Sequence, residues 1–219
     1  ATGRAYSRDR TPPVEKRLAD WIGAALPDFM AALENRRKVH ETRDLTERET
    51  RRQLDEAMLT AFNESRLLCA QRQGRNSVTA VNAFVAQKVR EAARARPDDE
   101  FYVGRIIIVR ANDRATELFN GDVGVVTYAE NGVGCDVFFG DRYVPAALLP
   151  AHDTGFALTV HQSQGSQFKS VAVVLSDDPV SALTTRELLY TGITRAKKRA
   201  VVFASEGVIR KAVATPVRR

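Results

Sequence analysis

The chain has 219 residues, of which 44% are hydrophobic and 27% are charged, so it can bury the core of one large domain and is not a disordered protein. Its formal net charge of +6 favours a polyanionic partner, and because basic residues recur along the chain, nucleic acid fits better than a membrane patch. No apolar run approaches the length of a membrane span, and the first residues contain no signal-peptide core. Cys69 and Cys135 have no metal-ligand spacing, so we expect buried, reduced thiols and a cytoplasmic protein.

The first part of the chain is dominated by helical periodicity. After a polar, basic tail, apolar residues at helical spacing predict one helix over residues 14–25 and a second through Phe29 and Leu33. Thr46 and Glu49 form a capping-box pair and predict the start of a third helix. The charge run of residues 36–38 is typical of a solvated helix face, and we assign it no binding role.

A short apolar run at residues 67–70 predicts a core strand. A polar loop containing Arg72 follows it, and Ser77 is then placed to cap a helix. The buried face of that helix is predicted to carry four valines, Val78, Val81, Val85 and Val89. Taken alone, an arginine in such a loop is usually a surface residue.

After residues 96–99 the pattern changes from helical to strand-like, and Asn-Gly and Gly-Asp pairs punctuate it. This pattern predicts a small β unit. Its aromatic residue Tyr128 could stack on bases. The adjacent Phe138 and Phe139 are expected to place one ring in the core of the unit and one outside it. The predicted strands span residues 105–109, 123–128, 135–139 and 142–144.

Beyond Pro150 an alternation of strands and helices resumes. Residues 156–160 predict a buried strand that turns abruptly into a polar loop around Gly165. Because ligands bind at the carboxyl ends of strands in open α/β sheets, this loop is a candidate site. The remaining predicted elements are a strand at 171–175, a capped helix from Thr184, a strand at 199–204 and a closing helix with a loose end at 206–219.

Two of these stretches resemble motifs V and VI of superfamily 1 helicases. They are ALTVHQSQGSQF at residues 157–168 and TTRELLYTGITRAKKRAVVF at residues 184–203. The closer match is the RecD type, in which TVHKSQGSEF is followed at a similar distance by LxYTxxTRAxx. LLCAQRQGRNSVTAVN, at residues 67–82, resembles the motif IV region of the same family. GRIIIVRANDRATELFNGDVGVV, at residues 104–126, is similar to the stretch that begins its inserted SH3-like barrel.

The resemblance implies a mixed α/β fold. Its expected form is the RecA-like second helicase domain, a parallel sheet flanked by helices, with a small SH3-like β-barrel inserted. We expect residues 1–100 to form the first part of the RecA-like domain, residues 101–153 the inserted β subdomain, and residues 154–219 the remainder.

The family's pattern assigns catalytic roles to two arginines. Arg195 would be the arginine finger and Arg72 a second contact to the γ-phosphate of ATP. An arginine suits this role because its planar fork meets two phosphate oxygens at once and stays charged. The sequence contains no G-x-x-x-x-G-K-[ST] motif and no strand that ends in paired acidic residues. ATP and Mg²⁺ would therefore be held mainly by a first motor domain that this chain, which starts at Ala1, lacks.

The same pattern divides motif V between two ligands. Thr159 and His161 would face single-stranded DNA, whereas Gly165, Ser166 and Gln167 would approach ATP. In two places the sequence departs from the family. Gln162 stands where the family commonly has lysine, and Gln167 stands where it has glutamate, so each position lacks the family's charge and nucleotide use could be weaker.

The resemblance implies the C-terminal motor domain of an ATP-dependent 5′ to 3′ DNA helicase, inactive alone. RecD proteins act as the alpha subunit of exodeoxyribonuclease V, beside RecB and RecC, in double-strand-break repair and recombination. The resemblance therefore implies four partners: single-stranded DNA, the N-terminal ATP-binding domain, RecB and RecC. We expect no metal bound by this chain and no membrane. Two alternatives stay open. One is the helicase part of a conjugative relaxase or a stand-alone RecD-like helicase. The other is a catalytically silent nucleic-acid-binding or assembly module.

Overall fold

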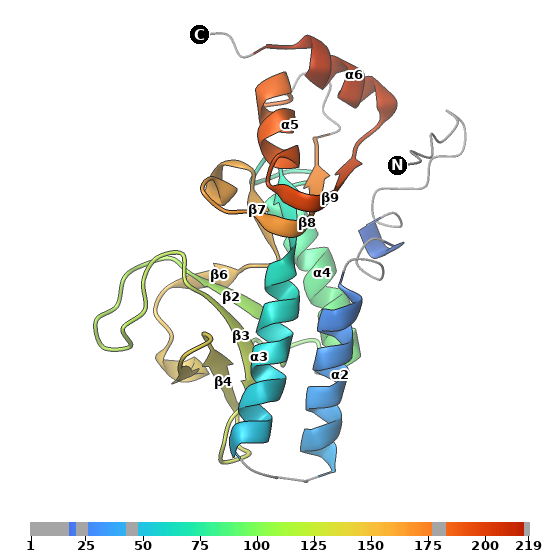
Figure 1. Cartoon of the computed structure of the whole chain (residues 1–219). Coiled ribbons are helices and arrows are strands. Elements are labelled where there is room, and N and C mark those ends of the chain that lie inside the picture. The colour runs from blue at the N-terminus through green and yellow to red at the C-terminus, as the bar shows by residue number, and fades with distance from the viewer. Residues whose placement is uncertain (1–17, 21–25, 43–47, 177–182, 217–219) are drawn as a thin grey trace.

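The computed structural model describes residues 18–20, 26–42, 48–176 and 183–216. Two sheets organise this part of the chain (Figure 1). One has four strands in the order β7-β1-β8-β9, and the other has five in the order β5-β4-β3-β2-β6. The predicted tail, most of the helix at 14–25, the cap at Thr46 and the last three residues of the chain lie outside the described residues.

The four-stranded sheet is entirely parallel. Its strands are β1 (Ser65–Cys69), β7 (Ala157–Thr159), β8 (Phe168–Val174) and β9 (Ala196–Phe203). Successive residues of β8 face opposite sides, so Val171 and Val173 pack with α5 (Arg186–Ile193) and α6 (Glu206–Ala214), while Ala172 and Val174 join the core formed with the other helices. The prediction of a parallel sheet flanked by helices is confirmed.

Three longer helices build the second layer: α2 (Pro27–Glu41), α3 (Arg48–Glu64) and α4 (Val78–Ala93). In Figure 1, α2 and α3 run side by side away from the parallel sheet, and the antiparallel sheet lies against α3. Ser77 caps α4 as predicted, because its hydroxyl accepts a hydrogen bond from the amide of Ala80 at 3.2 Å. Of the four predicted valines, Val78 is half-buried and the others are buried: Val81, Val85 and Val89.

The antiparallel sheet consists of β2 (Ile106–Val109), β3 (Val123–Tyr128), β4 (Cys135–Phe138), β5 (Tyr143–Pro145) and β6 (His152–Thr154). The expected strands are present. The sequence missed β6, because its residues are polar and lack an apolar alternation. Short 3₁₀ turns follow β5 (Ala146–Leu148) and β7 (His161–Ser163), and the second is labelled η2.

The aromatic residues of this sheet are more enclosed than expected. Phe138 is buried in the core shared with the helices, and Phe139 is half-buried in smaller clusters on the other face. The ring of Phe138 is therefore not free to stack on a base, and that of Phe139 is partly covered. The ring of Tyr128 lies parallel to that of His40, with 3.5 Å between ring centroids. One face of Tyr128 is thus occupied by the protein.

The expectation of a solvated charge run at residues 36–38 is wrong for Arg36, whose exposed fraction is 2%. Its Nε donates to Asp55 Oδ1 at 2.7 Å and to Thr127 Oγ1 at 3.1 Å. The Thr127 hydroxyl donates to the same Asp55 oxygen at 2.6 Å, and the Tyr143 hydroxyl donates to the other at 3.1 Å. Burial raises the pKa of the Tyr143 phenol, and the neighbouring Asp55 raises it further. We call Arg36, Asp55 and Thr127 the buried polar cluster; together with the hydroxyl of the more exposed Tyr143, it ties α2 and α3 to the antiparallel sheet.

The geometry of the helix explains why two residues of the charge run 36–38 are buried and the third is exposed. Consecutive residues on a helix point about 100° apart, so three in a row cannot share one face. Arg37 is also buried and pairs with Glu41 at 2.6 Å, whereas Lys38 pairs with Glu34 at 2.8 Å in solvent. Only Lys38 therefore matches the expectation, and the antiparallel sheet, which covers the helix pair, accounts for the burial of Arg36.

Asn82 of α4 fixes the point where the chain passes from the antiparallel to the parallel sheet. Its Nδ2 donates to the carbonyls of Thr154 and Ala157, at 2.9 and 3.3 Å, and its Oδ1 accepts from the amide of Ala157 at 2.8 Å. These bonds satisfy backbone groups that no ladder pairs at the junction. The end of β6 and the start of β7 are consequently held at a set distance from α4.

Candidate functional site

Strands β1 and β7 end side by side, since Cys69 pairs with Thr159. Arg72 lies in the exposed loop after β1, at this carboxyl edge of the parallel sheet. The Arg72 carbonyl accepts from the amide and the hydroxyl of Thr79, at 3.2 and 3.0 Å, which fastens the loop to the start of α4. Within the described ranges its guanidinium has neither a hydrogen bond nor an ion pair, so its full charge faces solvent.

The backbone amide and the side chain of Thr159 are hydrogen-bonded to Gln162. The amide and the hydroxyl of Thr159 both donate to Gln162 Oε1, at 3.1 and 3.0 Å, and the hydroxyl oxygen accepts from the amide of Gln162 at 3.2 Å. A lysine could not accept these bonds, because an ammonium group only donates. Since the single O–H of Thr159 points to Gln162, it does not point to a phosphate. The outward donor at this position is the Nε2 of Gln162.

His161 begins η2 and is exposed. It faces a hollow of about 740 Å³ between this turn and α5, which Gln164 and Thr191 also line. The buried Ser163 closes the turn by donating to the carbonyl of Val160 at 2.7 Å. His161 and Arg72 therefore follow neighbouring strands but open onto different hollows.

Motifs V and VI meet at the opposite, amino edge of the sheet. Gly165 reverses the chain with φ +85°, a conformation that favours glycine. The next residue, Ser166, accepts from Arg195 Nη1 at 3.4 Å through its carbonyl, and Arg195 Nε donates to the carbonyl of Thr191 at 3.2 Å. The backbone of Arg195 in turn accepts from the amide of Phe168 at 2.8 Å. The loop and the end of α5 are thus joined by two hydrogen bonds, and the third, to Thr191, orients the Arg195 side chain on its own helix.

This arrangement leaves the charge of Arg195 available. The guanidinium is half-buried and is oriented by two carbonyl oxygens, and no carboxylate among the described residues pairs with it. Ser166 and Gln167 are exposed beside it. Chemically, the group of side chains presents one oriented cation with a hydroxyl and an amide, as an anionic ligand with further acceptors requires.

The structure does not bring Arg72 and Arg195 together. Arg195 precedes Ala196, which pairs with Phe168 at the start of β8, whereas Arg72 follows Cys69, which pairs with Val174 at its end. From the first to the last residue of β8 the chain advances about 20 Å, at about 3.3 Å per residue. The expectation that both arginines contact one γ-phosphate is therefore not supported by this topology, because they lie at opposite edges of the sheet.

Other chemistry is limited in the described part of the chain. No group of three or more His, Cys, Asp and Glu side chains is arranged to hold a metal ion there. Likewise, none of the helices in the described ranges is both long and apolar enough to cross a bilayer. Both cysteines are free; Cys69 is buried, as predicted, and Cys135 is half-buried. Burial raises the pKa of the Cys69 thiol to about 12, so it stays protonated at neutral pH.

Known proteins resemble the part of the chain that forms this site. Residues 154–203 match the UvrD-like helicase C-terminal domain family. The RecBCD enzyme subunit RecD of Haemophilus influenzae is 38% identical over 166 residues, which are 75% of this chain and 25% of that protein. RecD of Mycobacterium tuberculosis (strain CDC 1551 / Oshkosh) is 39% identical over 158 residues, 71% of this chain and 27% of that protein. The chain is a RecD-like C-terminal helicase domain.

The RecD-like domain spans about a quarter of the length of these curated relatives. It also matches the ATP-dependent RecD2 DNA helicase of Deinococcus radiodurans, with 38% identity over 107 residues, 48% of this chain and 14% of that protein. Among solved structures it is similar to a Pif1 helicase from Bacteroides in complex with ADP-AlF3 and single-stranded DNA. That similarity has a TM-score of 0.45 and 17% identity, and it covers 81% of this chain and 50% of the other.

Sequence reasoning missed three residues that line a groove of about 390 Å³ beside Arg72, namely Asn82, Arg110 and Asp153. Asn82 and Arg110 each lie one position from a recognised pattern, after the valine face of α4 and after β2, and spacing alone gave them no role. Asp153 belongs to β6, the strand that the sequence did not predict. The role of Gln162 could have been suspected, since an acceptor side chain three residues beyond a strand end can satisfy the last amide of the strand.

Proposed function

We propose that this chain is the second, RecA-like motor domain of an ATP-dependent DNA helicase of the RecD type, which travels 5′ to 3′ on single-stranded DNA in double-strand-break repair. The relatives support this proposal, since they include subunits of the RecBCD enzyme and a RecD2 DNA helicase. ATP and Mg²⁺ would be held mainly by an N-terminal motor domain outside this chain, and proteins like RecB and RecC would be its partners in the cytoplasm.

The observation that carries the proposal is the contact between Arg195 and Ser166. An arginine finger acts by meeting charge that develops on the γ-phosphate, and it is most effective when its orientation is set before the phosphate arrives. Here the loop of motif V supplies that orientation through the Ser166 carbonyl. Closure of the cleft between two motor domains would then deliver Arg195, with Gly165, Ser166 and Gln167 beside it, to the nucleotide.

The same loop offers a route between nucleotide and DNA. Residues 161–167 span the sheet from its carboxyl edge, where His161 is exposed, to its amino edge, where Ser166 meets Arg195. Backbone bonds stiffen this span: Gln164 donates to the His161 carbonyl at 3.2 Å, and Ser166 donates to the Ser163 carbonyl at 3.1 Å. A shift of Ser166 on hydrolysis would therefore move His161, and Thr159 with it, against the DNA strand.

We further propose that the five-stranded antiparallel sheet corresponds to the family's SH3-like insertion. Its strands follow one another within residues 106–154, between α4 and β7. The proposed division of the chain is residues 1–100, 101–153 and 154–219, and β6 ends one residue beyond the middle segment. Gln167 stands where the family has a charged residue, so the site would bind nucleotide through neutral hydrogen bonds at this position.

The test is DNA-stimulated ATP hydrolysis by the full-length protein that carries this domain. Arg195→Ala should lower kcat by on the order of 10³-fold or more while DNA binding is retained, and Arg195→Lys should rescue little, since lysine lacks the planar fork. Arg199→Ala is the matched control, because Arg199 is exposed on β9 nearby. An ATPase rate that is unchanged in Arg195→Ala would overturn the finger assignment and favour a silent nucleic-acid-binding module.

A stand-alone RecD-like helicase remains the second candidate, and the match to the RecD2 DNA helicase favours it. The two candidates differ in their partners rather than in the chemistry of this domain. Co-purification of the full-length protein at native abundance decides between them: stable association with two larger subunits supports the RecBCD-like setting, and a monomer that unwinds DNA alone supports the second.

A further inference from the structure

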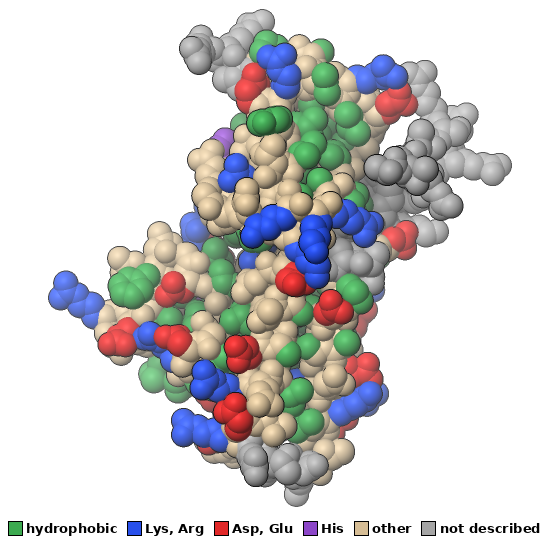
Figure 2. Space-filling model, in the orientation of Figure 1, with side chains coloured by type: hydrophobic (Ala, Val, Ile, Leu, Met, Phe, Trp, Pro, Cys, Tyr) green, Lys and Arg blue, Asp and Glu red, His purple; other side chains and the backbone are tan. Residues whose placement is uncertain are grey.

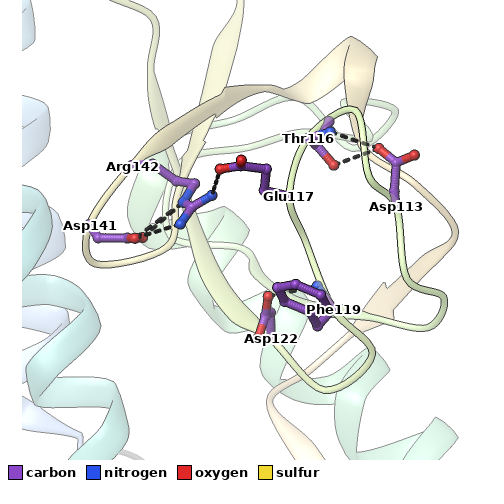
Figure 3. Close-up of polar contacts among 7 residues, drawn as sticks. All are labelled: Asp113, Thr116, Glu117, Phe119, Asp122, Asp141 and Arg142. Atoms are coloured by element: carbon purple, nitrogen blue, oxygen red, sulfur yellow. Dashed lines mark hydrogen bonds and ion pairs between the residues drawn. The ribbon is translucent and has the colours of Figure 1, made fainter.

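Arg66, near the start of β1, is a buried arginine that no carboxylate of the described residues neutralises. Its exposed fraction is 5%. Its Nη2 donates to Asn63 Oδ1 at 2.9 Å, while Nε and Nη1 have no partner in the part of the chain that the structure describes. Arg142 shows how carboxylates usually satisfy a guanidinium, since it contacts Asp141 Oδ2 and Glu117 Oε2, both at 2.8 Å (Figure 3). Arg66 lacks such compensation, so its burial costs free energy.

The surroundings of Arg66 do not offset its charge. Glu64, two residues earlier, pairs instead with Lys169 at 2.6 Å. The space-filling view shows Lys and Arg side chains gathered over the start of β8 and β9 (Figure 2), and Lys197 and Lys198 are exposed there. Burial lowers the pKa of Arg66 to about 10, which still leaves its guanidinium protonated at neutral pH. Stability of the fold therefore does not explain why a charge is kept at this position.

Two aromatic rings lie where a counter-ion would be expected. The central carbon of the Arg66 guanidinium is 4.2 Å from the ring centroid of Phe62 and 5.0 Å from that of Phe168. A cation is attracted to the face of an aromatic ring, and the attraction is stronger when both groups are removed from water. Phe168 is the last residue of motif V and is 9% exposed. Arg66 therefore attaches the end of motif V to α3 and β1.

The strand ladder alone does not fix Phe168. Pairing between β1 and β8 begins two residues later, at Ser170. On the other side, Phe168 pairs with Ala196. Ser170 then pairs with Arg199, three residues beyond Ala196, so β9 has one more residue than β8 in this interval. Such a bulge interrupts the regular ladder and changes the direction of the chain. The contact with Arg66 supplies a constraint that backbone pairing does not.

Phe168 is in turn bonded to the backbone of the proposed arginine finger, because its amide donates to the Arg195 carbonyl at 2.8 Å. We propose that Arg66 is a positioning residue, which fixes the ring of Phe168 and, through the Phe168 backbone, the orientation of Arg195. The inference rests on the proposed function and deepens it, because it names a residue outside the motif-like stretches that prepares the finger. Loss of the contact should loosen Phe168 and Arg195 together.

Amide hydrogen exchange of the full-length protein tests the contact itself. Arg66→Met fills most of the same volume but has neither a charge nor a planar group. The amide of Phe168 should exchange several-fold faster in this variant, because its ring loses the cation that holds it. The amides of residues 171–174, which β1 and β9 pair on both sides, should not change. Unchanged protection of the Phe168 amide would overturn the proposal.

DNA-stimulated ATP hydrolysis by the same full-length protein tests the consequence for the finger. Arg66→Met should lower kcat several-fold and leave the KM for ATP unchanged, because a finger acts on the transition state rather than on the bound nucleotide. The midpoint of thermal denaturation should not fall, since an uncompensated buried charge has been removed. A merely structural residue would lower the midpoint and leave kcat of the folded protein unchanged, and that result would also overturn the proposal.

Arg90→Met is the matched control. The Arg90 guanidinium of α4 lies 4.4 Å from the ring centroid of Tyr102, in the segment before β2, and its Nε is likewise buried without a partner among the described residues. This variant removes the same kind of contact elsewhere, so kcat and the exchange of the Phe168 amide should stay as they are. A fall in kcat equal to that of Arg66→Met would contradict a specific role for Arg66.

Two further variants test the route of the effect. Arg66→Lys should recover little of kcat, because an ammonium group has no flat face to lie against a ring, and it replaces Arg66→Met if that variant folds poorly. In a Phe168→Leu background, Arg66→Met should lower kcat no further; an undiminished further loss would mean that Arg66 acts by another route. Failure of the helicase proposal is recognised separately: Arg195→Ala would leave ATP hydrolysis intact, whereas Phe168 exchange would still respond to Arg66→Met.

Discussion

The side-chain oxygen of Gln162 accepts hydrogen bonds from both the amide and the hydroxyl of Thr159, at 3.1 and 3.0 Å. Gln162 stands where the family commonly has a charged lysine. In this chain its side chain is instead a hydrogen-bond acceptor that closes the turn after β7. This relationship decides what Thr159 can offer to DNA, since a hydroxyl that donates inside the protein cannot donate to a phosphate at the same time.

Gln162→Lys should lower the free energy of unfolding and strengthen oligonucleotide binding. Loss of two neutral hydrogen bonds costs about 0.5–1.5 kcal/mol each in unfolding free energy, while the new cation and the freed Thr159 hydroxyl should tighten oligonucleotide binding and raise the slope of log K against log salt by about 0.7. Thermal denaturation and the affinity for oligo-dT across a salt series measure the two effects. Gln164→Lys, two residues further along the exposed turn, is the control for charge alone. Equal gains in both variants would contradict a special role for position 162.

Asp55→Ala should be among the most destabilising single substitutions. It leaves the buried Arg36 without its counter-ion and leaves Thr127 and Tyr143 without an acceptor. Breaking a buried pair in this way costs about 3–5 kcal/mol. Urea denaturation measures the loss, and Glu34→Ala, which breaks an exposed pair with Lys38, should change stability by only about 0–1 kcal/mol. Similar losses in both would contradict the larger cost expected for breaking the buried Arg36–Asp55 pair.

Asn82→Ala should loosen the junction between the sheets. Three hydrogen bonds are lost, and the amide of Ala157 is left without a partner, at a cost of about 1–3 kcal/mol. Hydrogen exchange should speed up at Ala157 and its neighbours before it changes in β8. Gln87→Ala, on an exposed turn of the same helix, is the control. Unchanged exchange at Ala157 would mean that the strand holds its position without Asn82.

His40 should make stability depend on pH. Burial lowers the pKa of its imidazole below the usual value, and the charges of Arg36 and Arg51 lower it further. The folded state thus takes up a proton less readily than the unfolded state. Stability is complete above about pH 6.5, the ordinary histidine pKa, and falls as the pH drops from there toward the folded value. His40→Gln should flatten this part of the profile, as measured by urea denaturation across the pH range.

The sequence predicted most of the fold through local rules. Ser77 caps α4 because its side chain satisfies a nearby amide, and β8 appears as an apolar run because both of its faces are covered. Local rules failed where a distant element decided the outcome. Arg36 looks solvated until β3 covers it, and β6 carries no apolar alternation because it is a polar edge strand beside β2.

The candidate site was predicted only in part for the same reason. The resemblance assigned Arg195 and Ser166 to the same nucleotide, and the structure joins them through a hydrogen bond. Spacing could not show which edge of the sheet each residue occupies. Arg72 follows one strand and Arg195 precedes another, and only the parallel register reveals that they lie at opposite ends of β8. The acceptor role of Gln162 likewise depends on the turn's geometry as well as on residue type.

The first and last strands of the antiparallel sheet, β2 and β6, pair with each other, so the chain enters and leaves this unit at neighbouring points. By topology alone, the unit could be removed and its ends rejoined by a short linker between α4 and β7. The packing of its side chains does not allow this. Ile106, Val125 and Phe138 are buried in the same core as the helices, and Thr127 completes the buried polar cluster. If this unit were exchanged between related proteins, the residues of α2 and α3 that pack against it would therefore have to be exchanged as well.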